Sequence, residues 1–425
     1  MLKYTVLLMA ALSPLGCLET WTVPKEQWTS ALKDAGVDPG YATDTLTKLG
    51  LVSFSFAEPQ SPTLPAVFPP AVATAAELLK EEPQVSIYYA ANARVRNHLW
   101  VVLNRPVHSL AEVKPEEAAL LAATTNKVLG LLATKFHIPH AVVAQWNEAQ
   151  PGNLADRFTI EIVPPRPETA HVLNVWDKID SNHHVLFRGK YPPLLPAPTP
   201  EERAQDIAEW KAVLADASAF TFSEKVEGDP IEDWTQVQTH RRKAAESMLD
   251  ILHASLTEKG VKIERKPDSP LAAPDEIVSP KKGCAFCRKP VIDSQKTYET
   301  ELSYVFYNFK PAIPGAHFLI VPKRHIASYT GLTKEEVKDM HDLSVRLTQV
   351  LQEKFQRSDV KMYTQSGPPV GQTVPHSHMH LMLAPSPLRY IFFGLNYEQE
   401  TSLTAEQMKP TLEEIGKLLH DKQSI

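Results

Sequence analysis

The chain of 425 residues has few cysteines and no excess of basic residues. Its cysteines are Cys17, Cys284 and Cys287, and so small and odd a number argues against a framework of disulfide bonds. The formal net charge is −6, which gives no reason to expect a nucleic acid polymer as a partner. No apolar run is long enough to span a bilayer. With 43% hydrophobic and 22% charged residues, the composition suits a globular protein with a sizeable core, and the length indicates two or three domains.

The first 17 residues resemble an export signal. Met1–Lys3 precedes the apolar run Tyr4–Leu12, and the following S-P-L-G-C is similar to a lipoprotein cleavage site that ends at Cys17. We therefore predict export or lipid anchoring, with Cys17 as a membrane tether. The alternative is a buried N-terminal helix or strand in a cytoplasmic protein.

Proline-rich stretches divide the rest of the chain. Residues 18–83 are predicted to form a small helical segment and a linker, because prolines cluster between Glu58 and Pro70. Residues 84–217 and 281–425 form two domains that contain both strands and helices. Residues 218–280 between them hold a helix and a second proline-rich linker.

The two domains are similar in sequence. With His98 placed under His317, residues 98–136 align with residues 317–355 without a gap, and each copy has a strand, a turn and a long helix. The second helix opens with Thr333 and Glu336 at capping-box spacing, and the first opens with Pro115 near its first position. The shared order of elements favours an internal duplication.

Three histidines alternate near the end of the second domain. The stretch Gly371–Leu383 reads G-Q-T-V-P-H-S-H-M-H-L-M-L, so His376, His378 and His380 lie two residues apart. Alternate residues of a strand face the same side, and the three imidazoles should therefore project together. Such a group suits metal binding, or nucleophilic and acid–base chemistry on a phosphate. The alternative is a histidine-rich strand without a role.

The first copy lacks these histidines. With a one-residue gap, Asp156–Ile160 aligns with His376–His380, Pro106 aligns with His325, and the copy contains no cysteine. We interpret it as a degenerate copy that is retained for packing or for shaping the cleft of the second copy.

The pair Cys284-x-x-Cys287 has three interpretations. A redox pair would normally sit at a helix N-terminus within a βαβ pattern, which this region does not show. Half of a zinc site fits better, because zinc takes four Cys or His ligands, and His325 and His376 are the histidines that would complete it. Two buried thiols without a metal are the third interpretation.

Together these motifs resemble the histidine triad (HIT) superfamily of nucleotide hydrolases and transferases. The resemblance rests on the alternating histidines, the G-Q-T-V turn before them, and Pro314–Ile326, which reads P-G-A-H-F-L-I-V-P-K-R-H-I. It implies an α+β fold with two tandem HIT-like domains, each an antiparallel sheet with a long helix, plus the small N-terminal helical segment and an inserted helical region. Since HIT proteins often dimerise, it also implies a monomer that acts as an internal pseudo-dimer.

The resemblance gives roles to individual residues. His378 would attack the α-phosphate of a nucleoside phosphate and form a nucleotidyl-histidine. His380 would bind the phosphate or orient His378, His317 would contact the phosphate region, and Thr373 would supply a hydroxyl near the leaving group. By the same resemblance, a structural zinc would be held by Cys284, Cys287, His325 and His376.

The nucleotide is expected along the same strands. Asn308 would bind the ribose where the family has an acid, and Phe309 and Ile320 would pack against the base. Backbone N–H groups of the turn before the histidines would cradle phosphate oxygens. The residues assigned to nucleotide binding are Asn308, Phe309, Gln365, Gly371 and Gln372.

The predicted function is a nucleotide hydrolase or phosphoramidase that acts through His378. One alternative is a nucleotidyltransferase of the uridylyltransferase or dinucleotide phosphorylase type, which usually carries Gln where this chain has His380. Another is a non-catalytic HIT protein that binds a nucleotide or zinc. A catalytic zinc held by the three alternating histidines would leave the cysteine pair unexplained.

Overall fold

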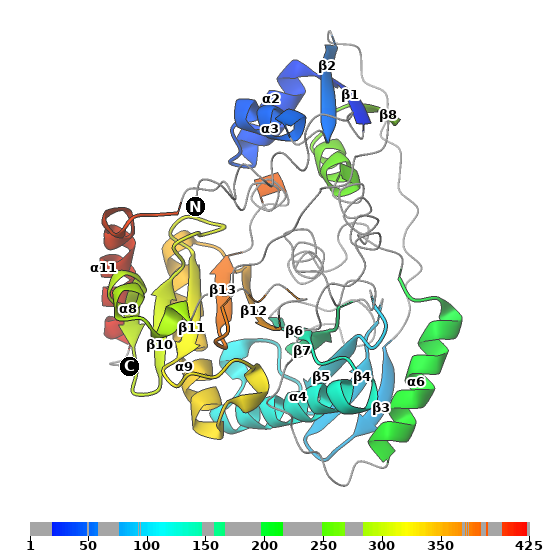
Figure 1. Cartoon of the computed structure of the whole chain (residues 1–425), viewed down its shortest axis with the longest axis vertical. Helices are drawn as coiled ribbons and strands as arrows, with labels where there is room; N and C mark the ends of the chain where they lie inside the picture. The colour runs from blue at the N-terminus through cyan, green and yellow to red at the C-terminus, as the bar shows by residue number, and fades with distance from the viewer. Residues whose placement is uncertain are drawn as a thin grey trace.

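The chain was analysed as a computed structural model, and its described residues form a mixed α+β protein (Figure 1). The described residues are 19–48, 51–57, 76–91, 93, 95–146, 157–165, 197–215, 249–267, 284–367, 370, 372, 374–383, 388–389 and 402–422. They confirm the predicted α+β class. Within them no helix is both long enough and apolar enough to cross a membrane.

A ten-stranded sheet forms the body of the molecule, with strand order β3-β4-β5-β7-β6-β12-β13-β11-β10-β9 and antiparallel neighbours throughout. Its first half holds β3 (Glu77–Glu81), β4 (Val85–Tyr89), β5 (Leu99–Leu103), β6 (Ala141–Trp146) and β7 (Thr159–Val163). Its second half holds β9 (Lys296–Glu299), β10 (Ser303–Tyr307), β11 (His317–Pro322), β12 (Val360–Ser366) and β13 (Met379–Leu383).

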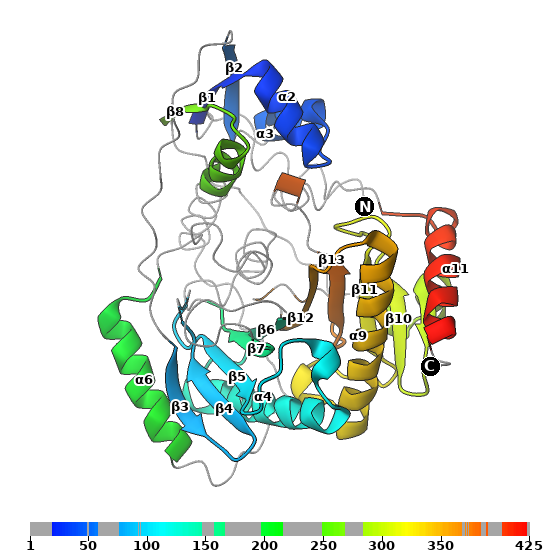
Figure 2. The same ribbon diagram turned by 180° about the vertical axis from the view of Figure 1, so that it is seen from behind.

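Helices accompany each half in the same places (Figures 1 and 2). The long helices α4 (Pro115–Lys135) and α9 (Lys334–Phe355) pack against each other, while α6 (Pro200–Ala215) contacts β3 and α11 (Ala405–Asp421) contacts β9. The expected helix starts are confirmed, with Pro115 in the first turn of α4 and Thr333 and Glu336 in a capping box at α9. Shorter helices are η1 (Leu110–Glu112), η3 (Ala285–Cys287), α8 (Lys289–Gln295) and η4 (Tyr329–Gly331).

The two halves of the sheet meet in a symmetric register. In the antiparallel pair β6–β12, Ala144 lies opposite Tyr363, and the ungapped alignment of His98 with His317 makes these two positions equivalent. Two halves related by a local two-fold axis would have this register. An arginine–glutamate pair also recurs in both halves. In each half, an arginine that follows β5 or β11 donates two hydrogen bonds to a glutamate of the long helix. These bonds measure 2.9 and 2.7 Å for Arg105–Glu117, and 2.9 and 2.7 Å for Arg324–Glu336.

Alternation along the strands separates two faces of the sheet. Met379 and Leu381 of β13 join Ile320 of β11 in the apolar cluster beneath α4 and α9. The opposite face carries the histidines and is called the active face below. Ile320 therefore lies on the wrong face to pack against a bound base, and that prediction was wrong.

A small separate sheet lies apart from the large one. Here the N-terminal module means β1 (Glu19–Pro24), α2 (Lys25–Asp34), α3 (Pro39–Lys48), β2 (Val52–Ala57) and β8 (Glu264–Pro267), with β1 parallel to β2 and antiparallel to β8. The predicted helices of this segment are present, but its strand β1 was missed, although its buried residues alternate along E-T-W-T-V-P. Strand β8 reads E-R-K-P and has no apolar pattern to predict it.

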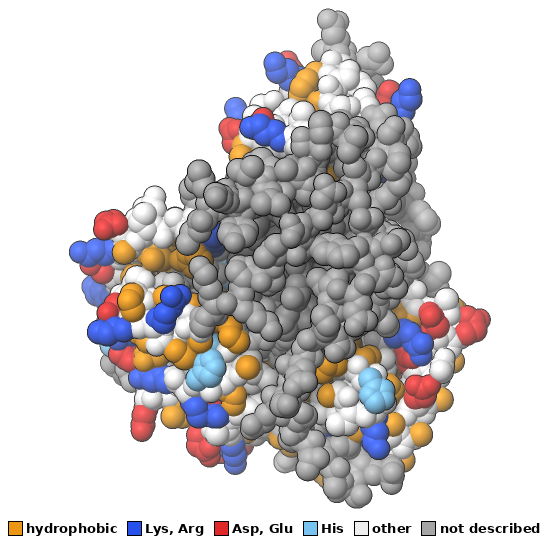
Figure 3. Space-filling view, viewed as in Figure 1, with side chains coloured by type: hydrophobic (Ala, Val, Ile, Leu, Met, Phe, Trp, Pro, Cys, Tyr) orange, Lys and Arg blue, Asp and Glu red, His pale blue; other side chains and the backbone are white. Residues whose placement is uncertain are grey.

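Residues of both signs cover the described surface on the side shown in Figure 3, where lysines and arginines are interspersed with aspartates and glutamates. Among the described side chains of that face, no continuous basic patch is visible. The predicted export segment and most of the two proline-rich linkers lie outside the described residues.

Candidate active site

The three alternating histidines lie around the start of β13, where His376 and His378 precede the strand and His380 is its second residue, on the active face. All three side chains are buried, and His378 is only 4% exposed. The residues between and after them, Met379 and Leu381, point to the helices on the other side. The rings of His378 and His380 lie next to each other, with centroids 5.0 Å apart. The hydrogen-bond partners of each of the three histidines indicate which ring nitrogen carries the hydrogen.

The hydrogen bond made by His378 defines its tautomer. Its Nδ1 lies 2.7 Å from the carbonyl oxygen of His376. A carbonyl oxygen can only accept, so Nδ1 carries the hydrogen and Nε2 keeps its lone pair. An imidazole in this state has a nucleophilic nitrogen at its outer edge, which is the form that attack on phosphorus requires.

A second chain of hydrogen bonds defines His317 and His380. The backbone N–H of Ala312 donates to Nδ1 of His317 at 3.1 Å, so the hydrogen of that ring sits on Nε2. Nε2 of His317 lies 3.0 Å from Nδ1 of His380 and donates to it. The remaining hydrogen of His380 is then on its own Nε2, where it can be donated to a negatively charged oxygen. The Nδ2 of Asn308, 3.3 Å from His317 Nε2, is also a donor, so that contact is not a hydrogen bond.

A buried apolar cluster borders His378, and the sequence prediction missed its main residue. Phe286 packs its ring edge-to-face against His378, with ring centroids 5.1 Å apart, and also packs against Phe306 at 5.8 Å. Leu319 and Val321 complete this cluster on the active face. Phe286 is the aromatic residue between the two cysteines. This position was the only feature of the sequence that could have indicated its contact with His378.

The residues predicted to bind the nucleotide fall in several places. Asn308 is buried beside His317, while Phe309 is 39% exposed. The side chain of Gln365 is buried and donates to the carbonyl of Val370 at 2.6 Å. Gln365 and Val370 both precede the segment that leads into the histidines. Gly371 and Thr373 lie outside the described residues.

Gln372 does not offer its backbone to a phosphate in this structure. Its N–H donates to the carbonyl of Gly367 at 3.2 Å. Its side chain accepts from the N–H of Gly367 at 2.7 Å and donates to the carbonyl of Ala327 at 2.8 Å. The predicted anion-binding role of this backbone N–H therefore stays a prediction. Gln372 instead holds the loop before the histidines against the segment after β11.

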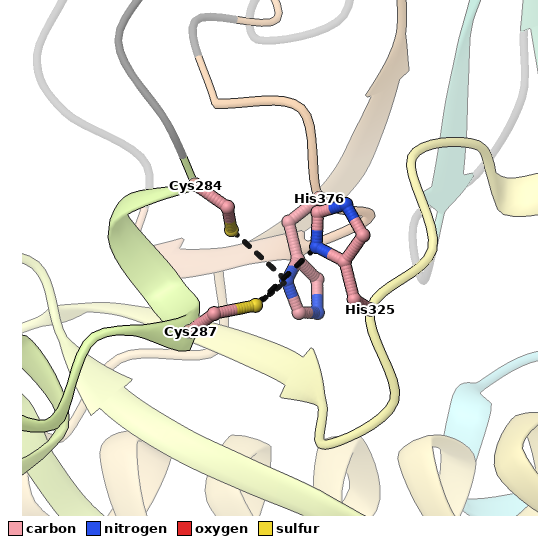
Figure 4. Close-up of side chains that lie close together, drawn as sticks. All are labelled: Cys284, Cys287, His325 and His376. Carbon is pink, nitrogen blue, oxygen red and sulfur yellow. Dashed lines mark hydrogen bonds between the residues drawn. The ribbon is translucent and has the colours of Figure 1, made fainter.

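Four candidate metal ligands converge beside the histidine strand (Figure 4). Nε2 of His376 donates to the carbonyl of Pro322 at 2.8 Å, which turns the lone pair of Nδ1 toward the cysteines. That nitrogen lies 3.3 Å from Cys284 Sγ and 3.5 Å from Cys287 Sγ. Nδ1 of His325 lies 3.3 Å from Cys287 Sγ, and all four ligand atoms are within 4.8 Å of one another.

These distances fit a tetrahedral zinc ion. Bonds of about 2.3 Å to sulfur and about 2.1 Å to nitrogen place ligand atoms roughly 3.5 to 3.8 Å apart. Burial lowers the pKa of His376, which favours the neutral imidazole that a metal needs. The pKa of the Cys287 thiol is raised to about 11, first by desolvation and then by the adjacent Cys284 sulfur. Two thiols this close need a cation if both are to ionise, so the donor set fits a closed structural site.

The matching positions of the first half hold other residues. In β5–β7 Trp100 lies opposite Glu161, just as Leu319 lies opposite His380 in β11–β13. The alignment of the two copies therefore needs no gap here, and the gapped alignment was wrong. Glu161 stands in the place of His380 and Thr159 in the place of His378. Glu161 accepts from His98 Nε2 at 2.7 Å and from Trp100 Nε1 at 3.1 Å.

The fold and the site define an α+β protein with buried, hydrogen-bonded imidazoles beside a two-cysteine, two-histidine centre. Known proteins share this region, and the sequence profile of the HIT domain matches residues 289–384. Bis(5′-adenosyl)-triphosphatase of Dictyostelium discoideum is 33% identical over 124 residues, which cover 29% of this chain and 80% of that protein. The chain therefore belongs to the histidine triad family.

Two further relatives show how far the similarity extends. The asymmetrical bis(5′-nucleosyl)-tetraphosphatase of Schizosaccharomyces pombe is 38% identical over 97 residues, 23% of this chain and 52% of that protein. The match thus spans about half the length of that relative. The solved diadenosine triphosphate hydrolase of Plasmodium falciparum is 23% identical with a TM-score of 0.27, covering 35% of this chain and 89% of that one. A superposition this weak carries no argument about function.

Proposed function

We propose that the protein is a nucleotide hydrolase that cleaves nucleoside phosphates at the α-phosphate through a nucleotidyl group on His378. The observation that supports this is the pair of complementary tautomers on the active face. His378 has its lone pair on Nε2, and His380 has a hydrogen on Nε2. Relatives named for the hydrolysis of dinucleoside polyphosphates indicate substrates of that class, together with nucleoside phosphoramidates.

The proposed reaction has two displacements. His378 Nε2 attacks the α-phosphorus, a P–N bond forms, and the bond between phosphorus and the leaving oxygen breaks with its electron pair. His380 donates a hydrogen bond to the phosphoryl oxygens as negative charge builds on them. Water then attacks the same phosphorus, loses a proton, and releases His378 together with the nucleoside monophosphate. The base is proposed to pack against the apolar cluster that contains Phe286, in place of Phe309 and Ile320.

Two alternatives share parts of this site. A nucleotidyltransferase would form the same adduct but pass the nucleotidyl group to a phosphate acceptor instead of water. A non-catalytic HIT protein would bind the nucleotide or zinc and form no adduct. We favour the hydrolase because this chain has His380 at the position where a transferase of the uridylyl type usually carries Gln.

Oxygen labelling tests the proposal and separates these alternatives. During hydrolysis of diadenosine triphosphate in ¹⁸O water, attack at the α-phosphorus places one label in adenosine monophosphate and none in adenosine diphosphate. Label in the diphosphate, or no product at all from folded protein, would count against the proposal. Product that forms only after addition of a nucleoside phosphate or sugar phosphate would favour the transferase.

We propose a structural zinc held by Cys284, Cys287, His325 and His376. When bound, the ion would hold two thiolates and two imidazoles together and would link the start of the domain to its histidine strand. The convergence of the four ligand atoms and the orientation of His376 support it. Metal analysis of the purified protein, with Cys284→Ser as the control that should bind zinc more weakly and retain less of it, tests this proposal.

We propose that the chain is a tandem of two HIT-like domains, the first degenerate, and that it is monomeric. The symmetric register at Ala144 and Tyr363 and the recurring arginine–glutamate pair support the duplication. Light scattering tests the monomer. Export or lipid anchoring through residues 1–17 remains a proposal from the sequence, and mass analysis of the mature N-terminus tests it.

A further inference from the structure

We propose that Arg389 is a positioning residue that holds the His317–His380 pair in its working tautomers and links that pair to the N-terminal module. Arg389 follows β13 and touches neither histidine according to the hydrogen bonds described here. It acts through the backbone of Ala312 on one side and of Gly36 on the other. Only the kinetic readout of this inference rests on the proposed function.

The first link runs through Ala312, which is 2% exposed. Nε of Arg389 donates to the carbonyl oxygen of Ala312 at 2.9 Å. The N–H of the same residue donates to His317 Nδ1 at 3.1 Å. Both backbone polar groups of Ala312 are therefore engaged, and a rotation that breaks one bond disturbs the other.

The loop around Ala312 is held at its ends by other bonds. At its start the side chain of Asn308 accepts from the N–H of Lys310 at 3.0 Å. At its end the N–H of Gly315 donates to the hydroxyl of Tyr307 at 2.8 Å. In the middle of this loop, the guanidinium of Arg389 donates to Ala312. A hydrogen bond from a charged donor is stronger than one from a neutral donor.

The second link reaches the N-terminal module. Nη1 of Arg389 lies 3.4 Å from the carbonyl oxygen of Gly36, the residue that ends the turn after α2. This turn is itself held, because the N–H of Gly36 donates to Lys33 at 2.9 Å and the N–H of Val37 donates to Leu32 at 2.8 Å. Apolar contacts accompany the link, since Ala312 belongs to the same buried cluster as the core of the module.

The chemical consequence lies in the hydrogen positions. If Ala312 no longer donates to His317 Nδ1, that nitrogen can carry the hydrogen and Nε2 becomes an acceptor. Nδ1 of His380 must then supply a hydrogen of its own, and its Nε2 loses the hydrogen that would face a phosphate oxygen. One backbone N–H thus decides which nitrogen of His380 can donate. We infer that Arg389 keeps that N–H in place.

Ring-¹⁵N histidine spectra of the full chain test the inference directly. The ¹⁵N shifts distinguish the two tautomers, and the signal of His317 is identified by its loss in His317→Gln. In Arg389→Met, which keeps the apolar stem but removes the donors, we expect His317 to populate the tautomer with hydrogen on Nδ1. In turnover assays we expect kcat to fall about tenfold while KM stays within about twofold. Arg389→Lys should restore part of the wild-type tautomer population of His317 and part of kcat.

A matched control comes from the first half. Arg203 donates to the carbonyl of Ala90 at 2.8 Å, so Arg203→Met removes the same kind of bond far from His317 and should leave its tautomer unchanged. An unchanged tautomer in folded Arg389→Met would overturn the inference. If wild-type protein shows the predicted tautomer but no turnover, the proposed function fails while this inference stands. Gly36→Ala strains the turn at φ +72° and should shift the tautomer slightly, and no shift would overturn the link to the module.

Discussion

His98 lies 2.7 Å from Glu161 in the first half of the sheet, at the positions that His317 and His380 occupy in the second. The pair is buried, and the carboxylate also accepts from Trp100. A carboxylate in the place of His380 cannot donate to a phosphate oxygen and would repel it. The first half therefore keeps the hydrogen bond but not the chemistry, which indicates a role in packing.

Replacing Glu161 should separate stability from activity. Glu161→Ala leaves His98 and Trp100 without their shared acceptor in the core, and we expect the free energy of unfolding to fall by about 3 kcal/mol. Because the first half has no nucleophilic imidazole at these positions, kcat of the folded protein should stay within about twofold. Urea denaturation and turnover assays check the two parts. A loss of kcat without a loss of stability would place Glu161 in the reaction.

Zinc binding should depend steeply on pH. The pKa of the Cys287 thiol is raised to about 11 without metal, so zinc must displace protons from both thiols at neutral pH. We expect the apparent affinity to rise by about a hundredfold per pH unit between pH 6.5 and 7.5. Competition with a chromogenic chelator measures this. Cys284→Ser should reduce the slope to about tenfold, and a flat profile in the wild-type protein would contradict thiolate ligation.

The buried histidine between the long helices should make the fold sensitive to acid. Burial lowers the pKa of His341, whose Nε2 donates to the carbonyl of Val113 at 3.0 Å. The unfolded chain binds a proton near pH 6.5 and the folded protein resists it, so stability is full above that pH and falls below it. His341→Gln keeps a donor and should reduce the slope below pH 6.5 by up to about 1.4 kcal/mol per pH unit. Urea midpoints at pH 5, 6 and 7 check this.

A close contact between the halves should make Gly367 hard to replace. Its φ is +107°, and a Cβ added there would lie 2.0 Å from Nδ1 of His140 in the first half. Gly367→Ala should lower the free energy of unfolding by about 3 kcal/mol. In a His140→Ala background, where the ring is gone, the same change should cost only about 1 kcal/mol of backbone strain. Equal costs in both backgrounds would show that the contact does not matter.

Local spacing predicted the parts of the protein that depend on neighbours in sequence. Cap residues predicted the starts of the long helices. Strand alternation, which was expected to hold for all three histidines, applies only to His380, because β13 begins at Met379. The four candidate zinc ligands were predicted through a family resemblance and do converge.

Contacts between distant segments account for what was missed. Strand β8 consists of four mainly polar residues, and they form a strand only because they pair with β1. Ile320 was assigned to the base although alternation along β11 already places it on the face opposite His317. The bonds of Gln372 to Gly367 and Ala327 depend on the folded loop and are not predictable from local sequence. Arg389 acts on the backbone of a residue far away in sequence, and no local pattern reports that.

The most direct measurement is the intact mass of the protein after brief incubation with adenosine 5′-phosphoramidate, for the wild type and for His378→Ala. Quenching at mildly alkaline pH preserves an acid-labile P–N bond. We predict one adenylyl group on the wild type and none on the variant, because the hydrogen bond from Nδ1 of His378 leaves the lone pair of that ring on Nε2. An adduct of equal amount on His378→Ala, or turnover by the wild type without any adduct, would contradict the covalent mechanism.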